Sequence, residues 1–153
     1  MKNILELIYP PAEIYIVEYE FDDKDMAIKV ICKVPQGSYY TAKPIPYVTA
    51  ENYVRCLSQA CYLLSEQVLD KKLIKTDISA DNFRQAAADY ELYYRNLAMT
   101  FHARVARGEE FKMRFSLKNW KEIKRINDYI LFTFSNEKTV LSGEMSFVFV
   151  AKK

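Results

Sequence analysis

The chain has 153 residues, with 22 basic and 20 acidic side chains and a formal net charge of +2. This length favours one domain over residues 1–153, large enough to bury about two-thirds of the surface of the unfolded chain. Half of the residues are apolar and only three are glycine, which excludes a disordered or low-complexity chain. The near-neutral charge argues against a nucleic-acid-binding protein.

The sequence contains no motif that would anchor a metal ion or a cofactor. It lacks CxxC, HExxH, a P-loop and GxGxxG, so we expect neither zinc nor nucleotide chemistry. The three cysteines, Cys32, Cys56 and Cys61, lie in apolar runs and are expected to be buried thiols in a reducing compartment. No apolar run approaches the ~18 residues of a membrane span, and no signal-type segment follows Met1. We therefore expect a cytoplasmic protein.

The first half of the chain predicts a β-hairpin followed by a long helix. Two β-rich runs, 13–21 and 26–34, flank a turn at 22–25. A loop rich in proline and tyrosine then leads to Thr49, whose hydroxyl can cap a helix that we expect to run to Leu69.

This helix has two faces of different character. Apolar residues at steps of three and four share one face: Tyr53, Cys56, Leu57, Ala60, Leu64 and Val68. The polar residues of the opposite face are Asn52, Arg55, Gln59 and Glu66. Such a polar stripe is either a solvated surface or the lining of a site, and the spacing favours neither.

The second half predicts another helix and three strands. Apolar residues recur on one helical face across 77–107, with Ser79 as N-cap and Gly108 just past the end, so we expect a second long helix there. Three further segments are rich in Phe, Ile, Val and Thr and are expected to be strands: 110–118, 125–135 and 140–151. The whole order predicts an α+β fold in which one antiparallel sheet wraps a helix.

Charge is spread unevenly along the chain. Acidic side chains dominate 13–25 and basic ones dominate 104–125. The basic segment could bind the phosphate of coenzyme A or of a phosphopantetheine arm, or it could be a solvated surface. His102 is the only histidine and lies beside an apolar helical face, so we favour a packed or surface histidine over a catalytic base. The remaining hydroxyl and amide groups suit polarising a thioester carbonyl or orienting a water molecule.

Several segments together resemble the FcoT-like, long-chain acyl thioesterase group of hot-dog-fold proteins. They are a tyrosine-containing loop, the helix segment 58–62 (SQACY), a second helix, a basic connection and the strand at 142–144 (SGE). The resemblance implies a hot-dog fold, usually assembled as a homodimer or a higher oligomer, with acyl-binding tunnels at the subunit boundary. It also implies fatty acyl thioesters of coenzyme A or acyl carrier protein as substrates. Some relatives are linked to isonitrile lipopeptide pathways, which would imply addition of glycine to an enoyl-carrier thioester.

The resemblance also implies site residues. It places two active-site tyrosines at Tyr9 and Tyr40, and Tyr39 competes with Tyr40 for the second position. Ser58 stands where the family has asparagine, before the glutamine at Gln59, and a serine offers one hydroxyl instead of an amide fork. The catalytic candidates are therefore Tyr9, Tyr40, Ser58 and Gln59. The candidates for substrate binding are Tyr39, Tyr47, Asn52, Arg55 and Tyr62.

The resulting hypothesis is a thioesterase. The helix N-terminus at 49–53 would polarise the thioester oxygen. Tyr40 and Ser58 would orient the attacking water, while Gln59 would fix the site. An apolar sheet edge and an excess of Tyr and Phe over the needs of one small core predict at least a dimer.

Two alternatives remain open. In the first, Arg55 binds the carboxylate of glycine, which adds to the β-carbon of an enoyl thioester. Arg55 could instead pair with Glu51 or Glu66 on its own helix. In the second, the protein is a non-catalytic acyl-chain carrier or a structural partner in a biosynthetic complex. Dehydration is disfavoured, because Arg55 stands where hot-dog dehydratases have an acidic residue.

Overall fold

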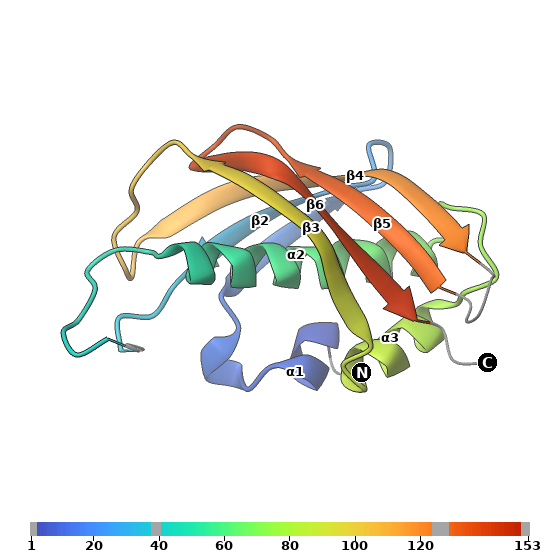
Figure 1. Ribbon diagram of the computed structural model, residues 1–153, viewed down its shortest axis with the longest axis horizontal. Coiled ribbons are helices and arrows are strands. Elements are labelled where there is room, and N and C mark those ends of the chain that lie inside the picture. The colour runs from blue at the N-terminus through green and yellow to red at the C-terminus, as the bar shows by residue number, and fades with distance from the viewer. Residues whose placement is uncertain (1–2, 38–40, 124–128, 151–153) are drawn as a thin grey trace.

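The computed structural model describes residues 3–37, 41–123 and 129–150. Its six strands form one antiparallel sheet in the order β1-β2-β4-β5-β6-β3. The elements in chain order are α1 (Ile4–Ile8), η1 (Pro11–Glu13), β1 (Ile16–Asp22), β2 (Ala27–Lys33), α2 (Ala50–Asp70), α3 (Ala80–Ala88), β3 (Leu92–Phe101), β4 (Glu110–Ile123), β5 (Tyr129–Asn136) and β6 (Leu141–Val150). The sheet curves over α2, and α1 and α3 lie on the side of α2 away from the sheet (Figure 1). This arrangement confirms the predicted α+β class.

The predicted hairpin and the first predicted helix are both confirmed. In the turn between β1 and β2, the Asp22 carboxylate accepts from the backbone N–H groups of Lys24 and Asp25 at 3.2 and 3.3 Å. Helix α2 begins after Thr49, as predicted, and ends one residue later than expected. The Asn52 side chain accepts from the Thr49 backbone N–H at 3.1 Å, which closes the first turn of the helix. Among the described residues, no helix is both long and apolar enough to cross a membrane.

The predicted second long helix over 77–107 is wrong. Only α3 is helical in this segment, and Ser79 caps it as expected. At Tyr90 the backbone adopts a φ of 58°, a left-handed conformation that ends the helical turn, and β3 follows. A β-bulge between Tyr94 and Asn96 inserts one residue into β3.

The bulge explains why the sequence looked helical. Side chains on one face of a regular strand recur every two residues. In β3 the bulge brings Tyr94, Leu97 and Phe101 to the same face, where they oppose buried residues of β6, at spacings of three and four. Residues on one face of a helix have the same spacings, so a helix and a bulged strand give the same sequence pattern.

The three C-terminal strands are confirmed with shifted ends. The predictions at 110–118, 125–135 and 140–151 correspond to β4, β5 and β6. Strand β4 continues five residues further than expected, to Ile123. The predicted strand residues 125–128 and 151 lie outside the described residues.

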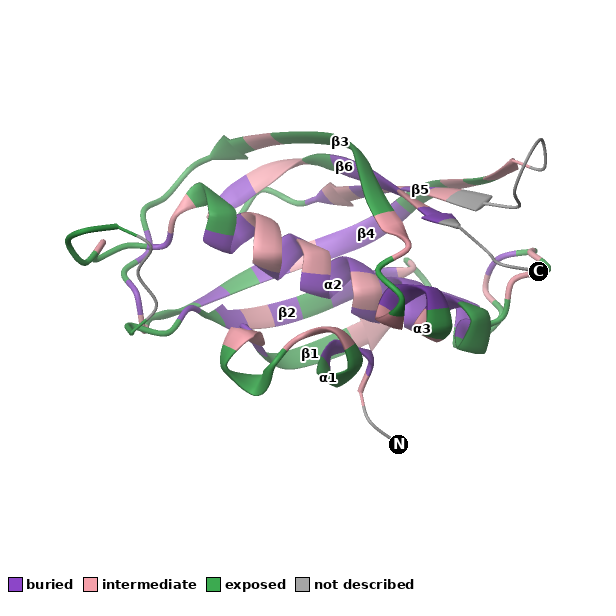
Figure 2. Cartoon of the chain, turned by 60° about the horizontal axis from the view of Figure 1, so that its bottom comes forward, coloured by how far each residue is buried: buried purple, intermediate pink, exposed green. Residues whose placement is uncertain are grey.

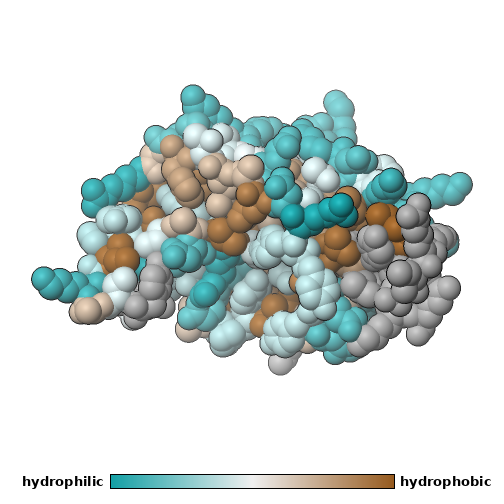
Figure 3. Space-filling model, in the orientation of Figure 1, coloured by the Kyte–Doolittle hydropathy of each residue, from teal (hydrophilic) through white to brown (hydrophobic). Residues whose placement is uncertain are grey.

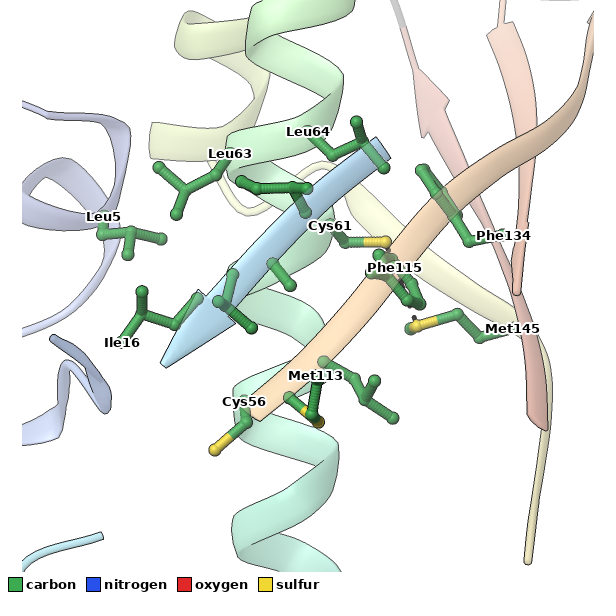
Figure 4. Packing of buried hydrophobic residues seen from close by; sticks show 14 of the residues in the cluster. Leu5, Ile16, Cys56, Cys61, Leu63, Leu64, Met113, Phe115, Phe134 and Met145 are labelled. Atoms are coloured by element: carbon green, nitrogen blue, oxygen red, sulfur yellow. Dashed lines mark hydrogen bonds between the residues drawn. The ribbon is translucent and has the colours of Figure 1, made fainter. Parts of the chain in front are cut away.

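The core lies between the concave face of the sheet and α2 (Figure 4). All six residues of the predicted apolar face of α2 are buried, and so are the three cysteines, which are free thiols. The sheet contributes stacked phenylalanines, with ring centroids 5.0 Å apart for Phe115 and Phe134 and 5.3 Å apart for Phe134 and Phe147. Burial of these rings fixes which face of α2 meets the sheet.

The polar stripe of α2 is mostly buried, so the solvated-surface interpretation is wrong for it. Asn52, Gln59 and Glu66 are less than 10 % exposed, whereas Arg55 is half-buried. Figure 2 shows buried and intermediate residues along most of α2, since α1 and α3 cover what the sheet leaves open. The Glu66 carboxylate accepts from Nε of Arg84 in α3 at 2.6 Å, which ties the two helices together.

Candidate functional site

One stripe of α2 stays accessible between the sheet and the short helices. Between residues 52 and 66, the partly accessible residues are Val54, Arg55, Ser58 and Tyr62, and we call this set the open stripe. Strand β3 borders it on one side, where Tyr94 contacts Ser58. The segment from α1 to η1 borders it on the other side, where Tyr9 packs on Tyr62 and Glu13 pairs with Arg55. Three segments that are far apart in the sequence therefore meet along the open stripe.

Ser58 makes two hydrogen bonds that define the centre of this stripe. Its hydroxyl donates to the carbonyl oxygen of Val54, one turn earlier in α2, at 2.7 Å. Its oxygen also shares a hydrogen bond with the hydroxyl of Tyr94. Tyr94 comes from the edge strand β3, so the pair joins the central helix to the edge of the sheet.

Three tyrosines gather around Ser58. Tyr9 and Tyr62 meet edge to face with ring centroids 6.2 Å apart. Burial raises the pKa of Tyr9 to about 12, and it raises the pKa of Tyr62 and of Tyr94 above the ordinary tyrosine value. At neutral pH all three hydroxyl groups are therefore protonated. Two further tyrosine candidates, Tyr39 and Tyr40, lie outside the described residues.

A small cavity of about 30 Å³ lies between α2, β3 and β6 beside this cluster. Its lining residues are Ser58, Cys61, Tyr62, Leu92, Tyr93, Tyr94 and Phe147. About 10–15 Å³ is enough to hold one water molecule. Apolar side chains also reach the surface nearby, and Figure 3 shows hydrophobic patches on the face of the molecule that β3 crosses. The site thus combines hydroxyl groups, a water-sized cavity and exposed apolar surface.

The side chains of the two amide candidates, Gln59 and Asn52, already form hydrogen bonds within the protein. The Gln59 side-chain oxygen accepts from the backbone N–H groups of Tyr15 and Ile16 at 2.8 and 3.3 Å. Its amide nitrogen donates to the Glu13 carbonyl oxygen at 2.7 Å. The Asn52 oxygen accepts at the helix N-terminus, as described above. Gln59 fixes the start of β1 against α2 and does not point toward the cavity beside Ser58.

Arg55 lies on the open stripe one turn before Ser58, and its ion-pair partner lies outside its own helix. The Arg55 guanidinium pairs with the carboxylate of Glu13 in η1, and it donates to the Tyr15 hydroxyl at 3.0 Å. Glu66, one of the same-helix partners expected for Arg55, binds Arg84 instead. The pair of Arg55 and Glu13 therefore closes one end of the open stripe.

Tyr47 lies beside the N-terminus of α2, away from the cavity. The Arg104 guanidinium stacks over its ring, 4.5 Å from the centroid. Both residues line a shallow hollow of about 730 Å³ that reaches Thr49. Ser58 lies nine positions after Thr49, which is about 13 Å of helix rise. One thioester carbonyl group cannot contact both the helix N-terminus and Ser58. The helix N-terminus, expected to polarise the thioester oxygen, is therefore too far from Ser58, expected to orient the attacking water.

Two arginines of the basic segment 104–125 bind other residues of the protein. Arg107 is buried and donates to the Asn52 side-chain oxygen at 3.0 Å. Arg114 lies on the sheet, where it pairs with Asp25 at 2.6 Å. These two arginines are therefore held by other residues of the protein, and Lys124 and Arg125 lie outside the described residues.

His102 lies at the surface just past the end of β3. A surface position was one of the two expected for this histidine. Its Nε2 atom hydrogen-bonds the hydroxyl of Ser142 at 2.7 Å. Within the described ranges, no group of three or more His, Cys, Asp or Glu side chains could hold a metal ion.

No known protein family and no curated protein matches this chain. The candidate site stands on the geometry of its own residues. Of the candidates named from the sequence, the structure brings Tyr9, Ser58 and Tyr62 together, with Arg55 one turn away. Sequence analysis missed Tyr94, because it placed this residue on a long helix instead of on a strand. The tyrosine doublet at 93–94 is typical of a strand and was the available signal.

Proposed function

We propose that this protein is a cytoplasmic hot-dog-fold enzyme of the FcoT-like type, which hydrolyses fatty acyl thioesters of coenzyme A or acyl carrier protein in lipid or natural-product biosynthesis. The observation that carries this proposal is the cluster of hydroxyl groups from Tyr9, Ser58, Tyr62 and Tyr94 on the open stripe. The single antiparallel sheet curved around a long helix supports it, because a hot-dog fold has that architecture.

In the proposed mechanism, protonated tyrosines stabilise the charge that develops on the thioester oxygen. Tyr9 and Tyr62 keep their protons at neutral pH and can donate hydrogen bonds to that oxygen. Water attacks the carbonyl carbon from the side of Ser58. The fatty chain would lie against the exposed apolar residues of β3, Leu97 and Phe101.

The enzyme is proposed to act as a homodimer or a higher homo-oligomer. Within the part of the chain that the structure describes, strand β3 is a sheet edge that pairs with β6 alone, and most of its residues are exposed. A long edge with exposed apolar side chains favours association with another strand. The open stripe lies next to this edge, so association would also cover the site.

A second candidate function keeps the fold and replaces water with glycine, which would add to the β-carbon of an enoyl-carrier thioester. The position of Arg55 on the open stripe, one turn from Ser58, favours it, since a guanidinium binds a carboxylate in a bidentate manner. Glycine would have to displace the Glu13 carboxylate from Arg55. A non-catalytic acyl-binding or structural partner is the third candidate, favoured by the shortage of strong acid and base groups on the open stripe.

Thiol release from long-chain acyl-CoA tests the first function. We expect the wild-type protein to release free thiol without a co-substrate, and Tyr62→Phe to lower kcat by about 10²- to 10³-fold, because it loses a hydrogen bond to the developing oxyanion. The matched control is Tyr19→Phe on β1, which removes a hydroxyl far from the cluster and should leave kcat unchanged. Background thiol release together with a gain of one glycine mass on an enoyl-carrier substrate would replace hydrolysis with glycine addition. If neither product forms, the acyl-binding candidate is favoured.

A further inference from the structure

We infer that Tyr94 and Ser58 form a subsite for the attacking water, in which Tyr94 accepts a hydrogen bond from that water. This inference rests on the proposed hydrolysis and deepens it by naming the residue that holds the nucleophile. Tyr94 would contact the water directly, whereas Ser58 is a positioning residue that acts through Tyr94.

The direction of the hydrogen bond between Ser58 and Tyr94 follows from a count of protons. A serine hydroxyl has one proton to donate. The Ser58 proton is used by the carbonyl oxygen of Val54, at 2.7 Å. The Ser58 oxygen must therefore accept, and Tyr94 must donate to it. The Tyr94 oxygen is left with lone pairs and no proton to offer, so it can bind only a donor such as a water O–H or an amine N–H.

The surroundings of Tyr94 keep its hydroxyl protonated, so that it donates to Ser58 and can accept a hydrogen bond from water. Half of the residue is exposed, yet its hydroxyl end lies near Tyr62 and Cys61, and burial of that end raises its pKa. The hydroxyl stays protonated at neutral pH and keeps donating to Ser58. The polar side chains of Ser58, Tyr62 and Tyr94 all line the cavity, and a bound water requires at least two polar partners.

The cavity beside Tyr94 has room for the attacking water. A volume of about 30 Å³ exceeds the 10–15 Å³ that one water needs. Leu92 and Phe147 form the apolar part of its wall. A water held in this cavity lies beside the Tyr94 side chain.

The reaction balances with water as the single co-substrate. The water oxygen forms a bond to the thioester carbonyl carbon while the bond from carbon to sulfur breaks. The leaving thiolate takes one proton of the water and becomes a thiol. The other proton stays on the new carboxylic acid, which then ionises in solution. Tyr94 accepts a hydrogen bond throughout and is neither protonated nor deprotonated.

A competition between water and hydroxylamine tests the subsite. With long-chain acyl-CoA, the products are the free acid and the hydroxamate, which are quantified separately. We expect Tyr94→Phe to lower acid formation roughly 10- to 100-fold, because a misplaced nucleophile loses about this much rate. We expect Leu92→Ala, which enlarges the cavity, to raise the ratio of hydroxamate to acid. Tyr19→Phe serves as the control, and equal ratios in all four proteins would overturn the inference.

A crystal structure of the wild type and of Tyr94→Phe gives a test that does not depend on turnover. We expect an ordered water within about 2.6–3.2 Å of the Tyr94 oxygen in the wild type, and none at that position in the variant. If this water is present but no thioester is hydrolysed, the proposed function fails and the water site stands. If hydrolysis proceeds but the water is missing or Tyr94→Phe keeps full activity, the inference fails and the proposed function stands.

Discussion

Two neighbouring residues of α2 hold opposite edges of the sheet in different ways. Gln59 is fully buried and uses both of its polar atoms to bind the backbone at the start of β1. Ser58 is half-buried and meets one side chain of β3, Tyr94, beside a water-sized cavity. Both polar atoms of the Gln59 side chain are hydrogen-bonded within the protein, whereas the hydroxyl groups of Ser58 and Tyr94 lie next to the cavity. A structural contact and the proposed site therefore lie at adjacent positions of one helix.

The two edge strands of the sheet, β1 and β3, also differ in how far their side chains favour association with another strand. Strand β1 carries Glu18, Glu20 and Asp22, and such charged side chains discourage pairing with another sheet. Strand β3 is ten residues long and carries Arg95 as its single charged side chain. Its exposed large side chains are Tyr93, Tyr94, Leu97 and Phe101. Only the β3 edge thus has the character of an association surface, in keeping with the proposed dimer.

Replacing Gln59 should have the largest effect on stability. Gln59→Leu would leave the Glu13 carbonyl oxygen and the Tyr15 backbone N–H without their present partner in a buried setting. Each buried group left unsatisfied costs about 1–3 kcal/mol, so for two groups we expect the free energy of unfolding to fall by about 2–6 kcal/mol. Urea denaturation followed by circular dichroism measures the change. An unchanged midpoint would show that β1 does not depend on this contact.

Charges placed on the two edges should act on assembly to different extents. Leu97→Lys puts a charge on the exposed apolar part of β3, and we expect the dimer dissociation constant to rise about 10- to 100-fold, or about 1.4–2.8 kcal/mol. Val17→Lys on β1 is the matched variant, since Val17 is also an exposed apolar residue of an edge strand. It should leave the constant unchanged. Sedimentation equilibrium measures both, and equal effects of the two variants would contradict an asymmetric use of the edges.

The smallest effect on stability is expected at Ser58. Ser58→Ala removes a half-buried hydroxyl whose partners, Val54 and Tyr94, remain close to solvent or to their other hydrogen bonds. We expect the free energy of unfolding to change by less than about 1 kcal/mol, although turnover should fall. The same urea experiment as for Gln59→Leu allows a direct comparison. A loss as large as that of Gln59→Leu would make Ser58 a structural residue.

The elements with local signals could be predicted from the sequence. The turn at 22–25, the cap at Thr49 and the cap at Ser79 depend on residues a few positions apart, and each lies where it was expected. The apolar face of α2 follows from helical spacing in the same way.

The remaining features depend on contacts between distant segments. The extent of β3 was missed because a bulge gives a strand the spacing of a helix. The partner of Gln59 lies more than forty residues earlier in the chain, and the partner of Arg55 is equally remote, so no spacing rule within α2 points to them. The meeting of Ser58 with Tyr94 likewise requires the folded sheet.

The bulge in β3 also determines where the strand can lose a residue without rearranging the site. Tyr94 shares a face of the sheet with Leu97 although it lies three positions before it, because Arg95 is the extra residue of the bulge. Deletion of Arg95 would remove the bulge and leave Tyr94 two positions before Leu97, still on the same face. Deletion of Ala98 would instead put Leu97 and Phe101 three positions apart in a regular stretch of strand, and one of them would turn to the opposite face. The bulge is therefore the place in β3 where the number of residues can change without altering which side chains line the site.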